Sequence, residues 1–487
     1  MISKAAVTST PFKECGLNRN FVILLIGFLV YGSVLLINDG FMALDEYWVG
    51  ITRYIPAQTS SVMTLVGPDD VKSPLQLLPM HSLAQAALSL GIEAPYWQYR
   101  FVLFVLGAFS VGLLFFAILK FVEFADLKKP EEKLLLCMLI FYFGAPFALT
   151  RPMFESIAAP WLTLAAVYAF AYDRHQRLRD LLIAVGAASM AFVLRQQLGS
   201  CALICVILPL MHRNWKHFFW ASTAGFMFFV LAGLPDYFIR GKFHFSLLNL
   251  FLYNYEHGAE YGQQSVLFYP AMIFVICLIP FFIKKYPSGF FQDLWSRYRS
   301  FYIVLFLFVF LHSFFPNKWE RFLISVVPLL LLIMFPLLSY LQSHFQKHKV
   351  RLISLYALNF FLFFVASFFP AQKNLIEMSR YLDRHPEIKR VYRVADTPGW
   401  ITEAFILNKK FEFVASDLQL AQSQNWNDCA NTLVVGQAQA ELMKPLTDQL
   451  KLNAVFNVNL IEQLAFKLNP QKNLRRVQLK LFSGCEK

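Results

Sequence analysis

Residues 101–122 have the sequence FVLFVLGAFSVGLLFFAILKFV, and this stretch decides the fold class. A helix rises ~1.5 Å per residue, so a run of this length crosses a hydrocarbon core of about 30 Å. Lys120 is its only charged residue. Comparable apolar runs occupy residues 21–37 and 322–341, and such runs recur as far as residue 370. We therefore expect an α-helical polytopic membrane protein.

The composition of the chain supports this class. Of 487 residues, 57% are hydrophobic and 15% are charged, and 53 are Phe, which is more apolar surface than a water-soluble core uses. The formal net charge is +13. The basic residues form short clusters between apolar runs, whereas a nucleic-acid-binding surface would gather them in one stripe. The orientation of the chain in the membrane explains their placement better.

The apolar pattern predicts about 11 membrane spans. They are placed at 21–39, 99–122, 134–150, 156–172, 181–195, 198–211, 216–234, 265–283, 300–315, 322–341 and 352–370. Lys4, Lys13 and Arg19 precede the first span without a cleavage site of small residues, so we expect a retained span with its basic flank in the cytoplasm. Every loop that this orientation places in the cytoplasm then contains Lys or Arg.

The two short spans around Arg195 leave an alternative open. Neither reaches about 20 apolar residues, so together they could form one broken helix. In that case the C-terminus would change sides, and the basic loops at 284–299 and 342–351 would not both stay in the cytoplasm. Two separate crossings satisfy the orientation rule better.

Two parts of the chain are expected outside the bundle. The first outer loop, about 40–98, alternates apolar and polar residues, as helices lying on the membrane do. Residues 371–487 have the composition of a soluble domain, which the predicted orientation places on the outer or periplasmic side.

The C-terminal domain is predicted to have a small α/β or α+β fold. Strands are expected at 388–394, 411–414, 432–435 and 454–458, and helices at 397–407 and 437–450. A structural cap or a partner-binding module is the simplest role for this domain, because it has no glycine-rich phosphate loop. Cys429 and Cys485 both lie in it, and an outer location would permit a disulfide.

Charged residues gather at the outer face of the predicted bundle. They are Asp45 with Glu46, Arg151 with Glu155, Arg195, the polar segment 236–261, and Lys318 with Glu320 and Arg321. Charges near helix ends inside a membrane protein are costly and often mark function. An acidic pair opposite several cations suits a transferase with an anionic leaving group, since a carboxylate can take a proton while cations hold a phosphate. Arg151 and Arg195 could equally be paired structural arginines.

These residues resemble motifs of the Alg9-like mannosyltransferases. This family of glycosyltransferases with the GT-C fold includes the GPI-anchor and lipid-linked-oligosaccharide mannosyltransferases of the endoplasmic reticulum. The similar motifs, spread over about residues 30–330, are the acidic pair Asp45–Glu46 after the first helix, Lys72–Ser73 with Pro79, Thr150–Arg151 with Glu155, Arg195, Asn249, Tyr253–Asn254, Tyr261–Gly262 and the stretch 317–322. That last stretch, with the sequence NKWERF, is the most specific match. The family's His is absent from it, and its Glu is displaced.

The resemblance implies a GT-C-like catalytic bundle over residues 1–370. It implies transfer of a sugar, mannose in the family, from a polyprenyl phosphate carrier to an acceptor hydroxyl, with inversion at the anomeric carbon. Asp45 would be the general base, and Glu46 would position the acceptor or share that work. The donor phosphate would be held by Lys318, Arg321 and Arg195.

Further residues and partners follow from the same resemblance. The residues expected to bind substrate are Lys72, Arg151, Glu155, Asn254, Tyr261 and Glu320. The acceptor would be a glycan, a glycolipid or another hydroxyl compound, and no nucleic acid is expected. No cofactor besides the lipid-linked sugar donor is implied, and no residues at metal-ligand spacing predict a bound metal. The compact first loop and overall length, and not the resemblance, favour a bacterial inner membrane protein with its active site facing the periplasm; an equivalent membrane with a luminal active site is the alternative.

Two other classes remain as alternatives. A transporter or lipid flippase would show internal repeats and charged or broken spans at the membrane midplane, whereas here the charges collect at one face. A non-catalytic membrane scaffold could display the C-terminal domain to a partner. A scaffold would not need Asp45, Glu46, Lys318 and Arg321 to face one another.

Overall fold

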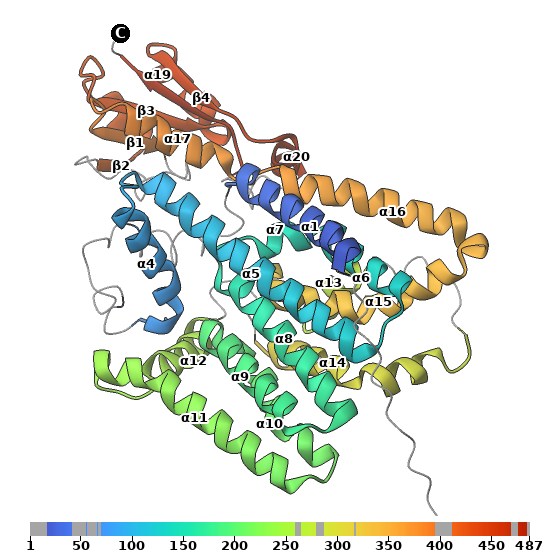
Figure 1. Cartoon of the computed structure of the whole chain (residues 1–487). Coiled ribbons are helices and arrows are strands. Elements are labelled where there is room, and N and C mark those ends of the chain that lie inside the picture. The colour runs from blue at the N-terminus through green and yellow to red at the C-terminus, as the bar shows by residue number, and fades with distance from the viewer. Residues whose placement is uncertain are drawn as a thin grey trace, which may run out of the picture.

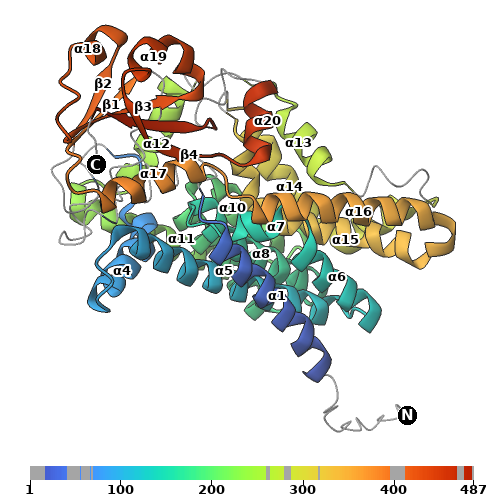
Figure 2. The same ribbon diagram turned by 90° about the horizontal axis from the view of Figure 1, so that it is seen from above.

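The computed structural model describes residues 17–40, 55, 66, 70–258, 264–278, 287–315, 318–394, 412–468 and 476–484. A helical bundle carries a small sheet domain at one of its ends (Figures 1 and 2). The bundle contains α1 (Leu17–Ile37), α4 (Pro74–Ser89), α5 (Pro95–Ala125), α6 (Lys129–Phe141), α7 (Ala145–Leu149), α8 (Phe154–His175), α9 (Leu178–Leu194), η2 (Gln196–Leu198), α10 (Gly199–Met211), α11 (Trp215–Arg240), α12 (Phe245–His257), α13 (Phe268–Ile276), α14 (Phe290–Ser313), η4 (Glu320–Val326), α15 (Val327–Ser343) and α16 (Phe345–Phe368). The C-terminal domain contains α17 (Lys373–Arg384), β1 (Arg390–Val394), β2 (Glu412–Ser416), α18 (Leu418–Gln422), β3 (Asn431–Gly436), η6 (Gln437–Gln439), α19 (Ala440–Thr447), β4 (Lys451–Phe456), α20 (Leu460–Leu468) and β5 (Leu479–Ser483).

The long apolar helices make this an integral membrane protein. Among the described residues, six helices are long and apolar enough to cross a membrane: Pro95–Ala125, Phe154–His175, Trp215–Arg240, Phe290–Ser313, Glu320–Ser343 and Phe345–Arg384. Two shorter apolar helices cover Phe21–Ile37 and Gln196–Met211. The predicted count of 11 crossings is therefore not confirmed, although a helix lies at the position of each predicted span.

The turn at Arg195 separates two helices that run in opposite directions. Arg195 has extended backbone angles (φ −140°, ψ 93°), and α9 ends just before it. Arg195 contacts Glu155 at the start of α8, while His212, just after α10, contacts Asp173 near the end of α8. Helix α10 therefore runs in the same direction as α8, and α9 runs against both. The prediction of two helices here, in preference to one broken helix, is confirmed.

The expected span 134–150 is interrupted, because the helix breaks between α6 and α7. Asn359 of α16 stabilises this break. Its side-chain amide donates to the Phe141 carbonyl at 2.7 Å and accepts from the Phe143 N–H at 3.1 Å. A side chain from another helix thus satisfies backbone groups that the break removes from the helical ladder.

The C-terminal domain is an α/β unit with a mixed sheet in the order β2-β1-β3-β5-β4. Strand β1 pairs in parallel with β2 and β3, and β5 pairs antiparallel with β3 and β4. The four strands expected from the sequence are confirmed, whereas β5 between β3 and β4 was not predicted. The helix expected at 437–450 corresponds to η6 and α19, and the one at 397–407 lies outside the described residues.

Cys429 is disulfide-bonded. Its expected partner, Cys485, lies outside the described residues. The preceding Gly484 donates its N–H to the Trp426 carbonyl at 3.1 Å, so the end of the described chain lies beside the segment that holds Cys429. Cys137, Cys201, Cys205 and Cys277, all in the bundle, are free thiols.

The C-terminal domain lies at the end of the bundle where α1 ends and α5 begins, which we call the domain end (Figure 2). Asn38, just after α1, donates to the Ser367 carbonyl at 3.0 Å. The guanidinium of Arg380 in α17 lies 4.5 Å from the centre of the Tyr96 ring in α5. A Cβ added to Gly40 would lie 1.9 Å from the Ala371 carbonyl oxygen, so only glycine fits there. The first contact joins α1 to α16 within the bundle, and the other two fix the domain and its linker against the bundle.

Glu462 holds the linker between bundle and domain. Its buried carboxylate accepts the Gln372 N–H at 2.8 Å. Asn459 donates to the Pro370 carbonyl at 2.9 Å and to the Glu462 carboxylate at 3.2 Å. Burial raises the pKa of Glu462 above its ordinary value of 4.5, against the opposing effects of these hydrogen bonds and of Arg476.

This raised pKa predicts a pH-dependent stability. The folded protein binds the Glu462 proton more tightly than the unfolded chain, so its stability falls as the pH rises above about 4.5. Glu462→Gln keeps an acceptor for Gln372 but removes the charge. Its midpoint of thermal unfolding should therefore rise relative to the unmodified protein, and by more at pH 8 than at pH 5. Glu462→Ala should instead destabilise the protein at both pH values, by about 1–3 kcal/mol. Equal pH profiles for Glu462→Gln and the unmodified protein would contradict the assignment.

Candidate active site

The structure describes eight of the residues predicted for the site. They are Lys72, Arg151, Glu155, Arg195, Asn254, Lys318, Glu320 and Arg321. The proposed acidic pair, Asp45 and Glu46, and the proposed substrate residue Tyr261 lie outside the described residues. The geometry of the site is therefore built from its cations and from the helix that leads into the acidic pair.

Arg151 holds the end of α1. It lies in the turn between α7 and α8, and its buried guanidinium donates to the Asn38 carbonyl at 2.8 Å and to the Gly40 carbonyl. It also donates to the Tyr99 hydroxyl at 2.9 Å. The last carbonyls of a helix lack partners within it and carry partial negative charge, so a cation there stabilises the helix end. Arg151 thus fixes the point from which the chain continues toward Asp45.

Glu155 and Arg195 form a buried ion pair. Glu155 is in the first turn of α8, and one of its carboxylate oxygens lies 2.9 Å from a guanidinium nitrogen of Arg195 in the α9–α10 turn. Glu155 is 3% exposed and Arg195 is 8% exposed. The Ser325 hydroxyl of η4 donates to the Glu155 carbonyl at 3.2 Å. Segments far apart in the sequence therefore meet at this pair.

Two arginines lie on one aromatic ring. The guanidinium carbon of Arg195 is 4.9 Å, and that of Arg321 is 5.2 Å, from the centre of the Phe322 ring. Arg321 also lies 5.9 Å from the centre of the Trp319 ring. Aromatic faces attract cations, and they hold guanidinium groups without neutralising them. Two of the three cations predicted to hold phosphate are therefore brought together.

Lys318 is buried two residues before η4, and three residues before Arg321 in the chain. It is 4% exposed, and its ammonium donates to the Phe315 carbonyl at 2.6 Å and to the Gln264 carbonyl at 3.0 Å. Burial lowers the pKa of the Lys318 ammonium. An ammonium has three N–H groups, so one remains for a further acceptor. Lys318 both ties two chain segments together and keeps hydrogen-bonding capacity.

Lys72 approaches the same region from α4. Its ammonium lies 5.6 Å from the centre of the Phe154 ring, next to Glu155. Helix α4 starts directly after Lys72, because Ser73 and Gln76 form a capping box at its N-terminus. The Lys72 carbonyl accepts a hydrogen bond from Arg240 at 3.0 Å. Lys72 and Ser73, which resemble the family's basic residue followed by Ser, thus lie at the start of α4.

A second buried polar group lies where α11 meets α12. Asp236 pairs with Arg240 at 3.0 Å, one turn later on the same helix, and accepts the Ser246 N–H at 2.9 Å. Gln196 donates to the Ser246 hydroxyl at 3.4 Å, which connects this group to the Arg195 turn. The sequence singled out the segment 236–261 but not this pairing. Its signal was an acid and a base four residues apart in an otherwise apolar helix.

The remaining predicted residues lie at the margin. Asn254 donates to the Leu250 carbonyl of its own helix α12 at 2.7 Å. Glu320, the first residue of η4, is exposed. Tyr269 of α13 was missed by the sequence analysis: its hydroxyl is hydrogen-bonded to the backbone of Trp319, within the electrostatic reach of Arg195, Glu320 and Arg321. A lone Tyr in an apolar helix gives no sequence signal for such a position.

The cations of the site suit an anionic group. Among the described residues, no group of three or more His, Cys, Asp or Glu side chains could hold a metal. Arg195 and Arg321 lie on the Phe322 ring, and the buried Lys318 is three residues before Arg321 in the chain; the carboxylate paired with Arg195 is that of Glu155. A phosphate group placed there would meet guanidinium and ammonium donors, which bind it strongly.

Comparison with solved structures gives the fold. The chain shares the GT-C fold of ArnT from Cupriavidus metallidurans. The crystal structure of that protein bound to undecaprenyl phosphate matches with a TM-score of 0.58 and 11% identity, over 96% of this chain and 98% of that chain. The apo structure matches with a TM-score of 0.57 and 13% identity, over the same shares.

Sequence comparison gives the family. No curated protein matches the chain. The sequence model of one family does match, over residues 69–399, which is more than half of the chain and begins after the acidic pair Asp45–Glu46. This stretch contains every described residue of the candidate site. The chain therefore belongs to the Alg9-like mannosyltransferase family, and it is a glycosyltransferase.

Proposed function

We propose that the protein transfers a sugar, mannose by analogy with its family, from a polyprenyl phosphate to an acceptor hydroxyl. Family membership supports sugar transfer. The likeness to a protein that binds undecaprenyl phosphate supports a lipid-phosphate donor. The observation that carries the proposal is the pair of arginines on Phe322 at the domain end of a membrane bundle.

The cations suit a phosphate leaving group. As the bond between the sugar and the phosphate breaks, negative charge grows on the phosphate oxygens. Donors fixed before the reaction stabilise that charge more in the transition state than in the bound substrate. Arg195 is fixed by Glu155 and Phe322, and Lys318 is fixed by two carbonyls. A bound phosphate would also favour the charged form of Lys318.

Asp45 is the proposed general base, and Glu46 would position the acceptor. Arg151 fixes the Gly40 carbonyl, and an extended chain reaches at most about 18 Å over the five residues to Asp45. Arg151, which anchors the start of this reach, is four residues before Glu155, and Glu155 pairs with Arg195. The covalent connection thus supports an acidic pair close to the cation cluster.

The reaction would be a single displacement. The acceptor oxygen forms a bond to the anomeric carbon while the bond from that carbon to the phosphate oxygen breaks. The hydroxyl proton moves to the Asp45 carboxylate, and the bonding electron pair leaves with the polyprenyl phosphate. Because attack and departure occur on opposite faces, the anomeric configuration inverts.

The other predicted residues receive different roles in this proposal. Lys72, Asn254, Tyr261 and Glu320 are proposed to contact the sugar or the acceptor. Arg151 and Glu155 would act through α1 and Arg195, so they are positioning residues. The basic loops favour an orientation that puts the domain end, with the C-terminal domain, on the outer side of the membrane. The compact first loop and overall length favour a bacterial inner membrane, whose outer side is the periplasm, over a membrane that encloses a lumen.

Asp45→Asn should preserve membrane insertion and remove transfer. Loss of a general base should lower kcat by about 10²–10⁴-fold. The assay would use purified protein with radiolabelled polyprenyl-phospho-sugars and membrane extract, and mannose should be preferred over other sugars. Glu93→Gln, which changes an exposed carboxylate at the same end of the bundle, is the control and should leave turnover unchanged. Unchanged turnover in Asp45→Asn would refute the base assignment.

Substitutions of the Glu155–Arg195 pair should separate stability from activity. Arg195→Ala leaves a buried carboxylate without its cation, so it should destabilise the protein by about 3–5 kcal/mol and lower transfer. The double variant Arg195→Met with Glu155→Met should recover most of the stability, because buried ion pairs can be replaced by apolar side chains. It should still transfer poorly for lack of the phosphate ligand. Normal transfer by a stable double variant would remove Arg195 from the donor site.

Lys318→Ala should raise the KM for the donor about tenfold or more, since a hydrogen bond to a charged group contributes about 1.5–3 kcal/mol. The KM for the acceptor should change little. Lys242→Ala, at an exposed lysine near the end of α11, is the matched control and should behave like the unmodified protein. A lower unfolding temperature with an unchanged donor KM would show that Lys318 only ties chain segments together.

A further inference from the structure

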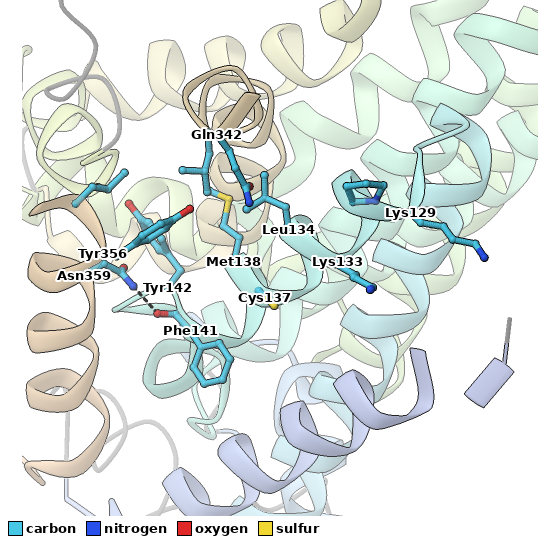
Figure 3. Close-up of a pocket in the computed structure, with 13 residues that line it drawn as sticks. Lys129, Lys133, Leu134, Cys137, Met138, Phe141, Tyr142, Gln342, Tyr356 and Asn359 are labelled. Carbon is cyan, nitrogen blue, oxygen red and sulfur yellow. Dashed lines mark hydrogen bonds between the residues drawn. The ribbon is translucent and has the colours of Figure 1, made fainter. Parts of the chain in front are cut away.

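A cavity far from the candidate active site lies between α6, α15 and α16. Its volume is about 590 Å³, within the range of small-ligand sites. Its apolar lining includes Leu134, Met138, Leu338 and Leu355. Figure 3 shows Lys129 and Lys133 at one side of this cavity, with Tyr356 and Asn359 at the other.

The two lysines form a small basic patch at the mouth of the cavity. Lys129 and Lys133 are four residues apart on α6, so they lie on one face of the helix. Both are exposed. Within the described part of the chain, neither ammonium group takes part in an ion pair or a hydrogen bond. Nearby Glu131 instead accepts the Lys128 N–H at 3.1 Å, as part of the helix cap. The patch therefore presents two ammonium groups that form no ion pair with a described residue, although Glu131 and Glu132 lie in the same turn of α6.

The polar groups deeper in the cavity have partners within the protein. The Asn359 side chain bonds to the backbone of Phe141 and Phe143. The Tyr142 hydroxyl bonds to the Ile276 carbonyl and lies 3.8 Å from the Met334 sulfur. A ligand would thus meet apolar surface inside and positive charge at the mouth. This is the chemistry of an anionic head group joined to a hydrocarbon chain.

The position of the patch in the bundle identifies the kind of lipid. Lys129 begins α6, directly after α5 has run from Tyr96 at the domain end to Ala125 at the opposite end. The Arg195 and Arg321 cluster lies at the domain end, so a lipid head group at Lys129 is in the other leaflet. A sugar donor bound there could not present its phosphate to that cluster. A structural phospholipid meets no such conflict.

We propose that this cavity binds an anionic phospholipid, whose head group contacts Lys129 and Lys133 and whose acyl chain lies between α6 and α16. The lipid belongs to the leaflet opposite the C-terminal domain. The bound chain fills space between helices that contact each other only in part, and so it stabilises the bundle. This site is independent of the proposed transfer reaction.

The test compares phosphatidylglycerol with phosphatidylcholine, each added in mixed detergent micelles to the full-length protein. The thermal midpoint of the unmodified protein should rise with phosphatidylglycerol and not with phosphatidylcholine. The double variant Lys129→Ala with Lys133→Ala should bind phosphatidylglycerol at least about tenfold more weakly. Lys128→Ala removes an exposed lysine next to the patch that does not line the cavity, and it should bind normally.

A second variant tests the cavity apart from its charge. Cys137 lines the cavity. In the variant Cys137→Trp the larger indole side chain occupies the space proposed for the acyl chain, while both lysines remain. This variant should also lose the response to phosphatidylglycerol. A phosphatidylglycerol with a photoreactive acyl chain should label α6 or α16. The proposal would be overturned if phosphatidylcholine stabilised the protein equally, or if both variants responded to phosphatidylglycerol like the unmodified protein. It would also be overturned if only other helices were labelled, or if a polyprenyl phosphate bound much more tightly and displaced the phosphatidylglycerol.

Discussion

The buried ion pair between Glu155 and Arg195 is the constraint on which the rest of the site depends. A carboxylate and a guanidinium without solvent are stable only if each has the other, so α8 and the α9–α10 turn must meet. Phe322 lies against the same guanidinium and brings η4 to this point. Three segments that are distant in the sequence thereby form one wall. The buried Arg151 adds a fourth by holding the end of α1.

The sequence predicted which charged residues belong to this wall better than it predicted which groups they bind. Charge in an apolar chain singled out Arg151, Arg195 and Arg321, because such residues are costly in a membrane unless they have a use or a partner. It could not show that Arg151 binds backbone carbonyls while Arg195 binds Glu155. Those partners are selected by tertiary packing. Tyr269 was invisible for the same reason.

Much of the fold was predictable, since apolar length defines membrane helices and alternation defines strands. The errors come from contacts between distant residues. Asn359 permits the break between α6 and α7, although its own sequence position is more than two hundred residues later. Strand β5 shows buried Leu479 and Leu481 in alternation with less buried neighbours. Its place between β3 and β4 depends on pairing that no local pattern encodes.

Helix α8 is fastened at both of its ends. Glu155 pairs with Arg195 at one end. At the other end, a carboxylate oxygen of Asp173 lies 2.8 Å from the His212 Nε2 and 2.6 Å from a guanidinium nitrogen of Arg299. A helix held at both ends in this way cannot tilt without separating the charged groups from their partners. Any widening of the bundle for a bulky lipid must therefore come from peripheral helices such as α11, few of whose residues are buried, while α8 stays in place.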